Sequence, residues 1–213
     1  MSQRSARPSP VRLVHSSSDT ADLTVRCMAQ EPAALRVLFQ RERSRVHRLL
    51  FRVVGSNGPM DDLLQDTFLQ VFRSLPSFRG ESSLQTWIDR CAVRVAYAYF
   101  GRRARQPALE PVREVSSPAP SPEEGAEQRN AIRRLYAELD RLEPRLRMAF
   151  TLFVLEGRAL REVAELMEST VATAKIRVWR ARRALEHRAR RDPLLSEFLA
   201  TDRESSDDEE LGQ

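Results

Sequence analysis

The sequence predicts an all-α protein made of two small helical domains joined by a Pro-rich linker. Apolar residues recur at helical spacing in both halves of the chain. Between the halves, prolines at positions 107, 111, 118, 120 and 122 interrupt any regular element. The chain of 213 residues is long enough for two small cores. We expect a disordered extension over 1–18, a first domain over 19–105, a linker over 106–126, a second domain over 127–191 and an acidic tail over 192–213.

The net charge of +5 is unevenly distributed along the chain. Residues 192–213 contain eight acidic side chains against Arg203 alone, so the chain before them is strongly basic. A basic body favours a polyanion as partner. We also hypothesise that the acidic tail folds back on the basic end of the second domain and weakens off-target DNA contact.

Several functional classes find no support in the composition. No apolar run approaches the roughly 18 residues of a membrane span, and the Ser/Arg/Pro-rich start lacks the apolar core of a signal peptide. Cys27 and Cys91 have no nearby Cys or His partner, which argues against a zinc site or a disulfide framework. The histidines are scattered, and no Gly-rich phosphate loop occurs. We expect a cytoplasmic protein that is not an enzyme, needs no cofactor and does not insert into membranes.

The first domain is predicted to begin with a short helix over 21–30 and a long helix after it. Pro32 suits a first helical position, and Gly55 is a typical residue at a helix C-cap. Apolar residues at helical spacing between these two predict one continuous helix. Turn-forming residues from 55 to 59 then separate it from the next helix.

Two more helices complete the first domain. The third is predicted over 60–74, with a polar face and a core stripe of Leu64, Phe68, Val71, Phe72 and Leu75. Acidic residues in a first turn favour the helix dipole, but this does not account for a polar face that continues to Gln65 and Asp66. The loop over 76–83 ends in residues suited to capping a fourth helix over 84–103. Aromatic residues interleaved with arginines in that helix are typical of single-stranded nucleic-acid binding.

The second domain is predicted to contain helices over 127–142, 144–156 and 160–167, followed by a basic helix capped by Ser169 or Thr170. Along this last helix the core stripe is Ala174, Val178, Ala181 and Leu185. The opposite face mixes basic, hydroxyl and apolar side chains. A short helix, a tight turn and a basic second helix are typical of the helix-turn-helix, whose second helix enters the DNA major groove. The plainer interpretation is a packed hairpin with a solvated Arg face, but it does not account for exposed Ile176 and Trp179.

The motifs follow one another in the order of a known family. The first domain contains DLLQDTF at 62–68 and FRGESS at 78–83, followed by Thr86 and Trp87. The second contains LEPR at 142–145, EG at 156–157, EVA at 162–164 and the basic run 175–182. This ordered set resembles regions two and four of bacterial sigma factors of the extracytoplasmic-function (ECF) group.

The resemblance implies an alternative sigma factor that binds core RNA polymerase, recognises promoter DNA through two elements and helps to melt it. It assigns polymerase binding to Asp61, Asp62, Gln65 and Asp66. The melted non-template strand of the minus-ten element would meet Phe78, Arg79, Ser82, Ser83, Trp87, Arg90 and Arg94, where stacking and cationic contacts offset the cost of unstacking a base. The minus-thirty-five duplex would meet Thr173, Lys175, Ile176, Trp179, Arg180 and Arg183.

The chain departs from the family pattern at several positions. Arg94 stands where Asn is usual, and Ala98 stands where Asp is usual. Glu168 occupies a turn position that is often Gly, which predicts a different turn geometry or some strain. Ala172 and Ala174 replace the usual Gly and Val before Lys175. We expect details of minus-ten reading and of groove entry to differ accordingly.

Two other interpretations of the sequence remain open at this point. A stand-alone helix-turn-helix regulator would bind duplex DNA through the second domain and use the first for dimerisation or effector sensing. An all-helical interaction module without DNA is disfavoured by the basic face. The resemblance also implies a restraining anti-sigma factor, although no residue specifies one, and a protein that is monomeric when free.

Overall fold

The structure is a computed structural model, and it describes residues 18–105 and 124–189 of the chain. Every regular element in these two ranges is helical, so the all-α prediction is confirmed for them. The N-terminal extension, most of the linker and the acidic tail, with its suggested contact to the second domain, lie outside the described residues. None of the described helices is long and apolar enough to cross a membrane.

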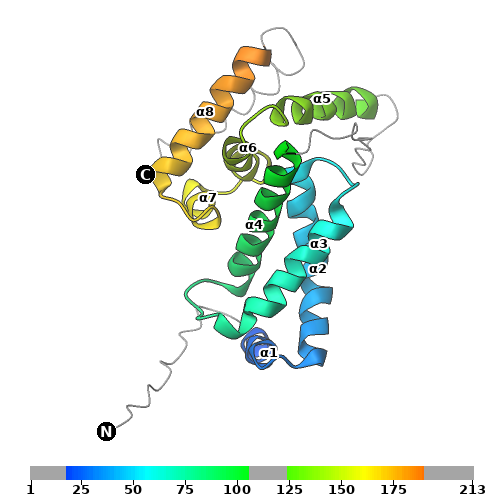
Figure 1. The fold of residues 1–213 in the computed structure, drawn as a ribbon, viewed down its shortest axis with the longest axis vertical. Helices are drawn as coiled ribbons and strands as arrows, with labels where there is room; N and C mark the ends of the chain where they lie inside the picture. The colour runs from blue at the N-terminus through cyan, green and yellow to red at the C-terminus, as the bar shows by residue number, and fades with distance from the viewer. Residues whose placement is uncertain (1–17, 106–123, 190–213) are drawn as a thin grey trace.

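Four helices form the first part of the molecule (Figure 1): α1 Ser18–Met28, α2 Pro32–Val54, α3 Met60–Ser74 and α4 Leu84–Arg105. Pro32 is the first residue of α2, and Gly55 ends it in the left-handed conformation at φ 73°, as predicted. The bounds of α3 match the prediction. The first helix begins and ends earlier than the predicted 21–30.

The core face of α3 is rotated slightly from the predicted stripe. Phe68 and Val71 are buried as expected, but Met60 and Leu63 are also buried, whereas Leu64 and Phe72 are only partly covered. Met60 and Leu63 join because α3 packs against both α2 and α4, which widens the covered face beyond a single stripe.

The second part contains α5 Glu124–Leu139, α6 Pro144–Phe150, α7 Leu160–Leu166 and α8 Val171–Ala189. Helix α5 begins inside the predicted linker, where acidic residues after Pro122 suit a first helical turn. It ends before the predicted 142, and the amides of Arg141 and Leu142 donate to the carbonyls of Glu138 and Leu139 in a turn. The predicted helix over 144–156 is α6 followed by a π-helical segment, Thr151–Leu155. This widened turn ends where the amide of Glu156 donates to the carbonyl of Thr151.

Helix α4 lies between the two parts of the molecule (Figure 1), in contact with α2 and α3 and also with α6 and α7. The sequence predicts one apolar side for this helix, made of Leu84, Trp87, Ile88, Cys91, Ala92, Val95 and Tyr99. The four central residues are buried, whereas Leu84, Trp87 and Tyr99 are only partly covered, and the buried residues extend beyond the predicted side. They also include Asp89, Val93, Ala96 and Phe100. Met148, Ala149 and Leu152 from the second part join the core of the first. One apolar core therefore extends across both parts, and a second, smaller cluster that includes Leu139, Phe150 and Leu185 lies within the second part.

Candidate nucleic-acid interface

Helix α8 presents an apolar and basic surface to solvent. Its core side is Ala174, Val178, Ala181 and Leu185, all buried as predicted. Ile176 and Trp179 are 51% and 57% exposed on the other side. Large apolar side chains left in water cost free energy that a partner surface recovers. The face of α8 that the sequence predicted as a contact surface is therefore open.

Basic side chains surround the exposed indole of Trp179. The guanidinium carbon of Arg183 lies 5.3 Å from the ring centroid of Trp179, within the range of a cation–π contact. Lys175 and Arg180 are also exposed on α8. Val171, 44% exposed at the first turn, extends the same surface, although sequence reasoning did not select it. Val171 lies four residues, or about one helical turn, before Lys175, so the helical repeat places both on the same face and could have identified it.

The turn before α8 has defined hydrogen bonding. Thr170 Oγ1 accepts the backbone N–H of Thr173 at 3.1 Å, which makes Thr170, rather than Ser169, the capping residue. The hydroxyl of Thr173 lies 2.8 Å from that of Thr170, so this predicted DNA contact is already engaged in the cap. Glu168 has φ 49°, and the amide of Ser169 donates to the carbonyl of Ala164 at 2.8 Å. This is the hydrogen-bond pattern of a Schellman motif, in which Gly is favoured where Glu168 stands.

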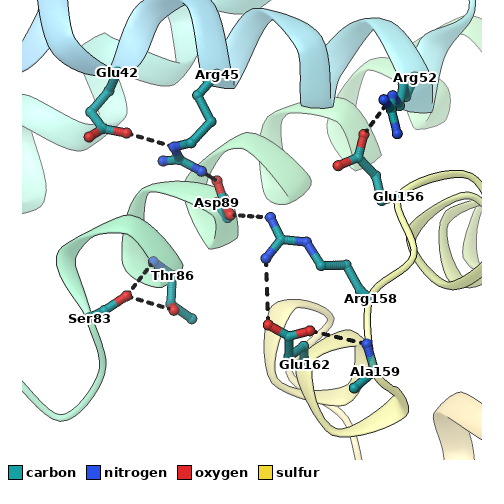
Figure 2. Close-up of polar contacts among 10 residues, drawn as sticks. All are labelled: Glu42, Arg45, Arg52, Ser83, Thr86, Asp89, Glu156, Arg158, Ala159 and Glu162. Atoms are coloured by element: carbon teal, nitrogen blue, oxygen red, sulfur yellow. Dashed lines mark hydrogen bonds and ion pairs between the residues drawn. The ribbon is translucent and has the colours of Figure 1, made fainter.

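The loop after α3 and the start of α4 form a second candidate surface. Trp87 is half-buried, and its ring meets Phe78 edge to face with centroids 5.4 Å apart. Phe78, predicted at the strand, is only 5% exposed, so it supports Trp87 from beneath. Ser83 Oγ accepts the amide of Thr86 at 3.0 Å and caps α4 (Figure 2). Arg79 is exposed and Ser82 is half-buried beside this cap.

The two arginines of α4 that are predicted to hold a strand form ion pairs with the second part of the molecule in this structure. Arg90 Nη2 donates to Glu165 Oε1 at 2.6 Å, and Arg94 pairs with Glu168. Glu165 lies on α7 and Glu168 in the turn before α8. Sequence reasoning treated Arg94 and Glu168 as two separate departures from the family pattern. The fold makes them partners.

A buried carboxylate next to this surface was also missed. Asp89 is 2% exposed and pairs with Arg45 of α2 and with Arg158, which donates at 3.0 Å (Figure 2). Burial raises the pKa of the Asp89 carboxyl, while the two guanidinium groups oppose the shift. The available signal was that Asp89 is the one acidic residue in this arginine-containing helix and lies next to the apolar Ile88, but its partners lie 44 and 69 residues away.

The polar face predicted on α3 is fully open. Asp61, Asp62, Gln65 and Asp66 are all exposed. Leu69, one turn after Gln65, is 41% exposed and adds an apolar side chain to this face. An acidic surface with an apolar side chain at one end fits a protein partner better than it fits DNA. Among the described residues, no group of His, Cys, Asp and Glu could hold a metal ion, and both cysteines are buried and free.

Comparison with known proteins identifies the family. Residues 38–106 match the family model for sigma-70 region 2, and residues 132–185 match that for sigma-70 region 4. The ECF RNA polymerase sigma-E factor of Haemophilus influenzae is 32% identical over 178 residues, which cover 78% of this chain and 93% of that protein. This chain belongs to the ECF sigma factors.

Other relatives and folds agree with that assignment. The sigma-E factor of Escherichia coli K12 is 30% identical to this sigma factor over 181 residues, covering 78% of this chain and 92% of that protein. A structure of CnrH in complex with the cytosolic domain of CnrY matches with a TM-score of 0.58 at 21% identity, covering 83% of this chain and 99% of that one. The sigma factor RpoE bound to the anti-sigma factor NepR, from Bartonella quintana, matches at 0.55 and 20% identity, covering 74% and 97%.

Family membership decides among the interpretations that the sequence left open. The protein is an alternative sigma factor that functions in transcription initiation, rather than a stand-alone helix-turn-helix regulator. Region 2 comprises most of α2 together with α3 and α4, and region 4 contains the helix-turn-helix of α7 and α8.

Proposed function

We propose that this sigma factor binds core RNA polymerase through the exposed face of α3. Asp61, Asp62, Gln65 and Asp66 provide charge and hydrogen-bonding groups, and Leu69, one turn further along, provides an exposed apolar side chain. Polar groups next to an apolar anchor are common in protein interfaces. The relatives' name, RNA polymerase sigma factor, supports this choice of partner.

The first DNA contact is made by region 2. Trp87 stacks against a base of the melted minus-ten strand while Arg79, Arg90 and Arg94 hold its phosphates, and Ser82 and Ser83 line the loop end. Phe78 acts through Trp87, because its ring is covered and supports the indole edge to face.

The second DNA contact is made by α8 in the major groove of the minus-thirty-five element. Lys175, Arg180 and Arg183 supply donors for phosphates or purine edges. Ile176 and Trp179 pack against thymine methyl groups, while Thr173 stays with the cap and fixes the entry of the helix. The observation that carries this proposal is the exposure of Trp179 and Ile176 on a basic face. Large apolar side chains are unfavourable on a helix face that only contacts water, so their presence indicates a binding partner.

An anti-sigma factor is a further proposed partner. The solved structure of RpoE holds the anti-sigma factor NepR, and the fold of this chain matches that of RpoE.

The test is transcription in vitro from a supercoiled genomic library with purified core polymerase. We expect discrete start sites that require both core enzyme and this protein. Tight binding of a specific duplex by the protein alone, without any polymerase-dependent initiation, would contradict the proposal.

A further inference from the structure

We propose that the solvent face of α2 is a third nucleic-acid contact, which binds the sugar-phosphate backbone of duplex DNA without reading its sequence. None of the surfaces assigned above on α3, α4 and α8 includes a residue of this face. Helix α2 lies on the side of α4 away from α8 (Figure 1). The proposal therefore goes beyond the proposed function, and it does not depend on which residues of α4 and α8 contact the promoter.

Four exposed arginines form two rows along α2. Arg36 and Arg43 lie seven positions apart, as do Arg41 and Arg48. Seven positions are about two helical turns, or about 10.5 Å, so each pair lies on one line along the helix. At about 100° per residue, the two lines are about 140° apart around the helix axis. We call the two rows, with the strip between them, the α2 basic face; the strip contains Val37, Gln40, Ser44 and His47.

The arginines of the α2 basic face lack the acidic partners that other arginines of α1–α4 have. Ion pairs with Asp or Glu are formed by Arg26, Arg45, Arg52, Arg90, Arg94, Arg102 and Arg103. Among the described residues, the four arginines of the α2 basic face form no ion pair. Burial raises the pKa of Glu156, and Arg48 is one of the cations that oppose this rise, so only Arg48 lies near an acid.

No negative charge within α2 offsets the α2 basic face. Glu42 is the one acidic residue of the helix, and it pairs with Arg45. A helix face that only contacts water usually mixes both signs of charge, because opposite charges one turn apart attract and like charges repel. An exposed face with four arginines and no acid favours a polyanion as its partner.

The strip between the rows decides which polyanion fits. Gln40 and Ser44 are exposed, and Val37 is 42% exposed. An acidic partner helix would need a line of apolar side chains along this strip, as in a coiled coil. Amide and hydroxyl groups instead bond to the phosphate and sugar oxygens of DNA. The α2 basic face therefore fits a nucleic-acid backbone better than it fits a protein helix.

The dimensions of the α2 basic face suit a duplex. From Arg36 to Arg48 the helix rises by about 18 Å, which corresponds to about five base pairs at about 3.4 Å each. A helix is about 10–12 Å wide and the minor groove only about 6 Å, so α2 lies over this groove rather than in it. One row then contacts the phosphates of each strand. Because phosphates carry no base information, this contact adds affinity for DNA and leaves promoter choice unchanged.

The experiment measures binding of the full-length protein to a fluorescein-labelled duplex of arbitrary sequence, by anisotropy at several salt concentrations. Arg36→Gln with Arg41→Gln removes one charge from each row. Both residues are exposed and Gln is a good helix former, so we expect the fold to persist. Arg26→Gln with Arg73→Gln is the matched control, because both arginines are exposed, lie outside α2 and give the same change in net charge.

We expect the slope of log affinity against log salt concentration to become shallower by about 2 in the Arg36/Arg41 variant, since each lost phosphate contact removes about 0.9. The control should keep the slope of the unmodified protein. An unchanged slope in the Arg36/Arg41 variant would overturn the proposal. An equal change in the control would also overturn it, because general charge would then be the cause.

A cross-linking measurement shows directly what contacts the strip. Ser44→Cys carries a photo-reactive label, and Cys27 and Cys91 are buried, so the label is confined to position 44. We expect a cross-link to the duplex that is lost at high salt and in the Arg36/Arg41 background. In the presence of core polymerase, a cross-link to a polymerase subunit in place of DNA would identify a protein contact and overturn the proposal.

Transcription with core polymerase tests the proposed function separately. The Arg36/Arg41 variant should start transcription at the same sites as the unmodified protein, because the α2 basic face reads no bases. If the unmodified protein supports no promoter-specific initiation, the proposed function fails, whereas the salt slope and the cross-link to the duplex still decide whether α2 contacts DNA.

Discussion

Trp179 shows how one exposed side chain separates two interpretations of the same helix. A solvated basic helix needs only Arg and Lys on its outer face, whereas an indole there leaves apolar area in water at about 25 cal/mol for each Å². Trp179 is 57% exposed with Arg183 beside it, so its indole can stack or pack against DNA without any rearrangement of the core.

Trp179→Ala with Arg180→Ala is expected to abolish promoter-specific transcription while binding to core polymerase is retained. The melting temperature should change by only a few degrees, because both side chains lie outside the core. Transcription and core-binding assays on the same preparation check this. A variant that fails to fold would show that Trp179 supports the core.

Glu168 is a residue held at φ 49°, where Gly has no steric penalty. Glu168→Gly is expected to be more stable than Glu168→Ala by about 1 kcal/mol, because both lose the pair with Arg94 but only Gly relieves the backbone. Denaturant unfolding of the two variants measures the difference. Equal stabilities would show that the turn is unstrained.

At the scale of single helices, α3 and α8 are both amphipathic, but their exposed faces carry opposite charge. Each buries one face against its neighbours and leaves the other open, acidic on α3 and basic on α8. Opposite charge on the two open faces favours different partners, a protein for α3 and DNA for α8.

Asp62→Ala with Gln65→Ala is expected to weaken core polymerase binding at least tenfold and to leave duplex binding by α8 unchanged. The lost interactions are polar contacts at an interface, so the fold should persist. A pull-down titration with core enzyme measures the loss of polymerase binding, and circular dichroism checks that the fold persists. Normal assembly of the holoenzyme would place the polymerase contact elsewhere.

At the scale of the whole molecule, the two regions depend on one another through the end of α2. Its terminal carbonyls, the ring of Tyr136 and the buried Arg147 meet at Gly55. Region 4 therefore contributes to the stability of region 2 in this arrangement.

Gly55→Ala is expected to lower the free energy of unfolding by about 1–3 kcal/mol, from the left-handed backbone and the contact with Tyr136 together. Gly58→Ala is the matched control, since no atom lies within 4 Å of the position that its Cβ would take and its φ is not positive. Thermal unfolding of both variants provides the comparison. Equal losses for both would remove the special role assigned to Gly55.

Many of the positions and ends of the helices could be predicted because they depend on interactions between residues that are close in sequence. Pro32, Gly55 and the bounds of α3 follow from local backbone preferences and a repeat of 3.6 residues. The exposed face of α8 follows from the same repeat, which is why Ile176 and Trp179 were found. The family resemblance assigned Phe78 to the strand-binding surface, but its side chain is buried. A loop residue gives no periodic signal from which its burial could be predicted.

The sequence alone determined the fold class, the order of the helices and the two faces that carry the proposed contacts, since these depend on interactions within a few turns of helix. Only the tertiary structure decided that Asp89 is buried, that Arg94 and Glu168 are partners and that Arg147 completes α2. The partners of these side chains lie some 70 to 94 residues away in most cases. No periodicity records such pairs, because packing between two regions, rather than local propensity, brings them together.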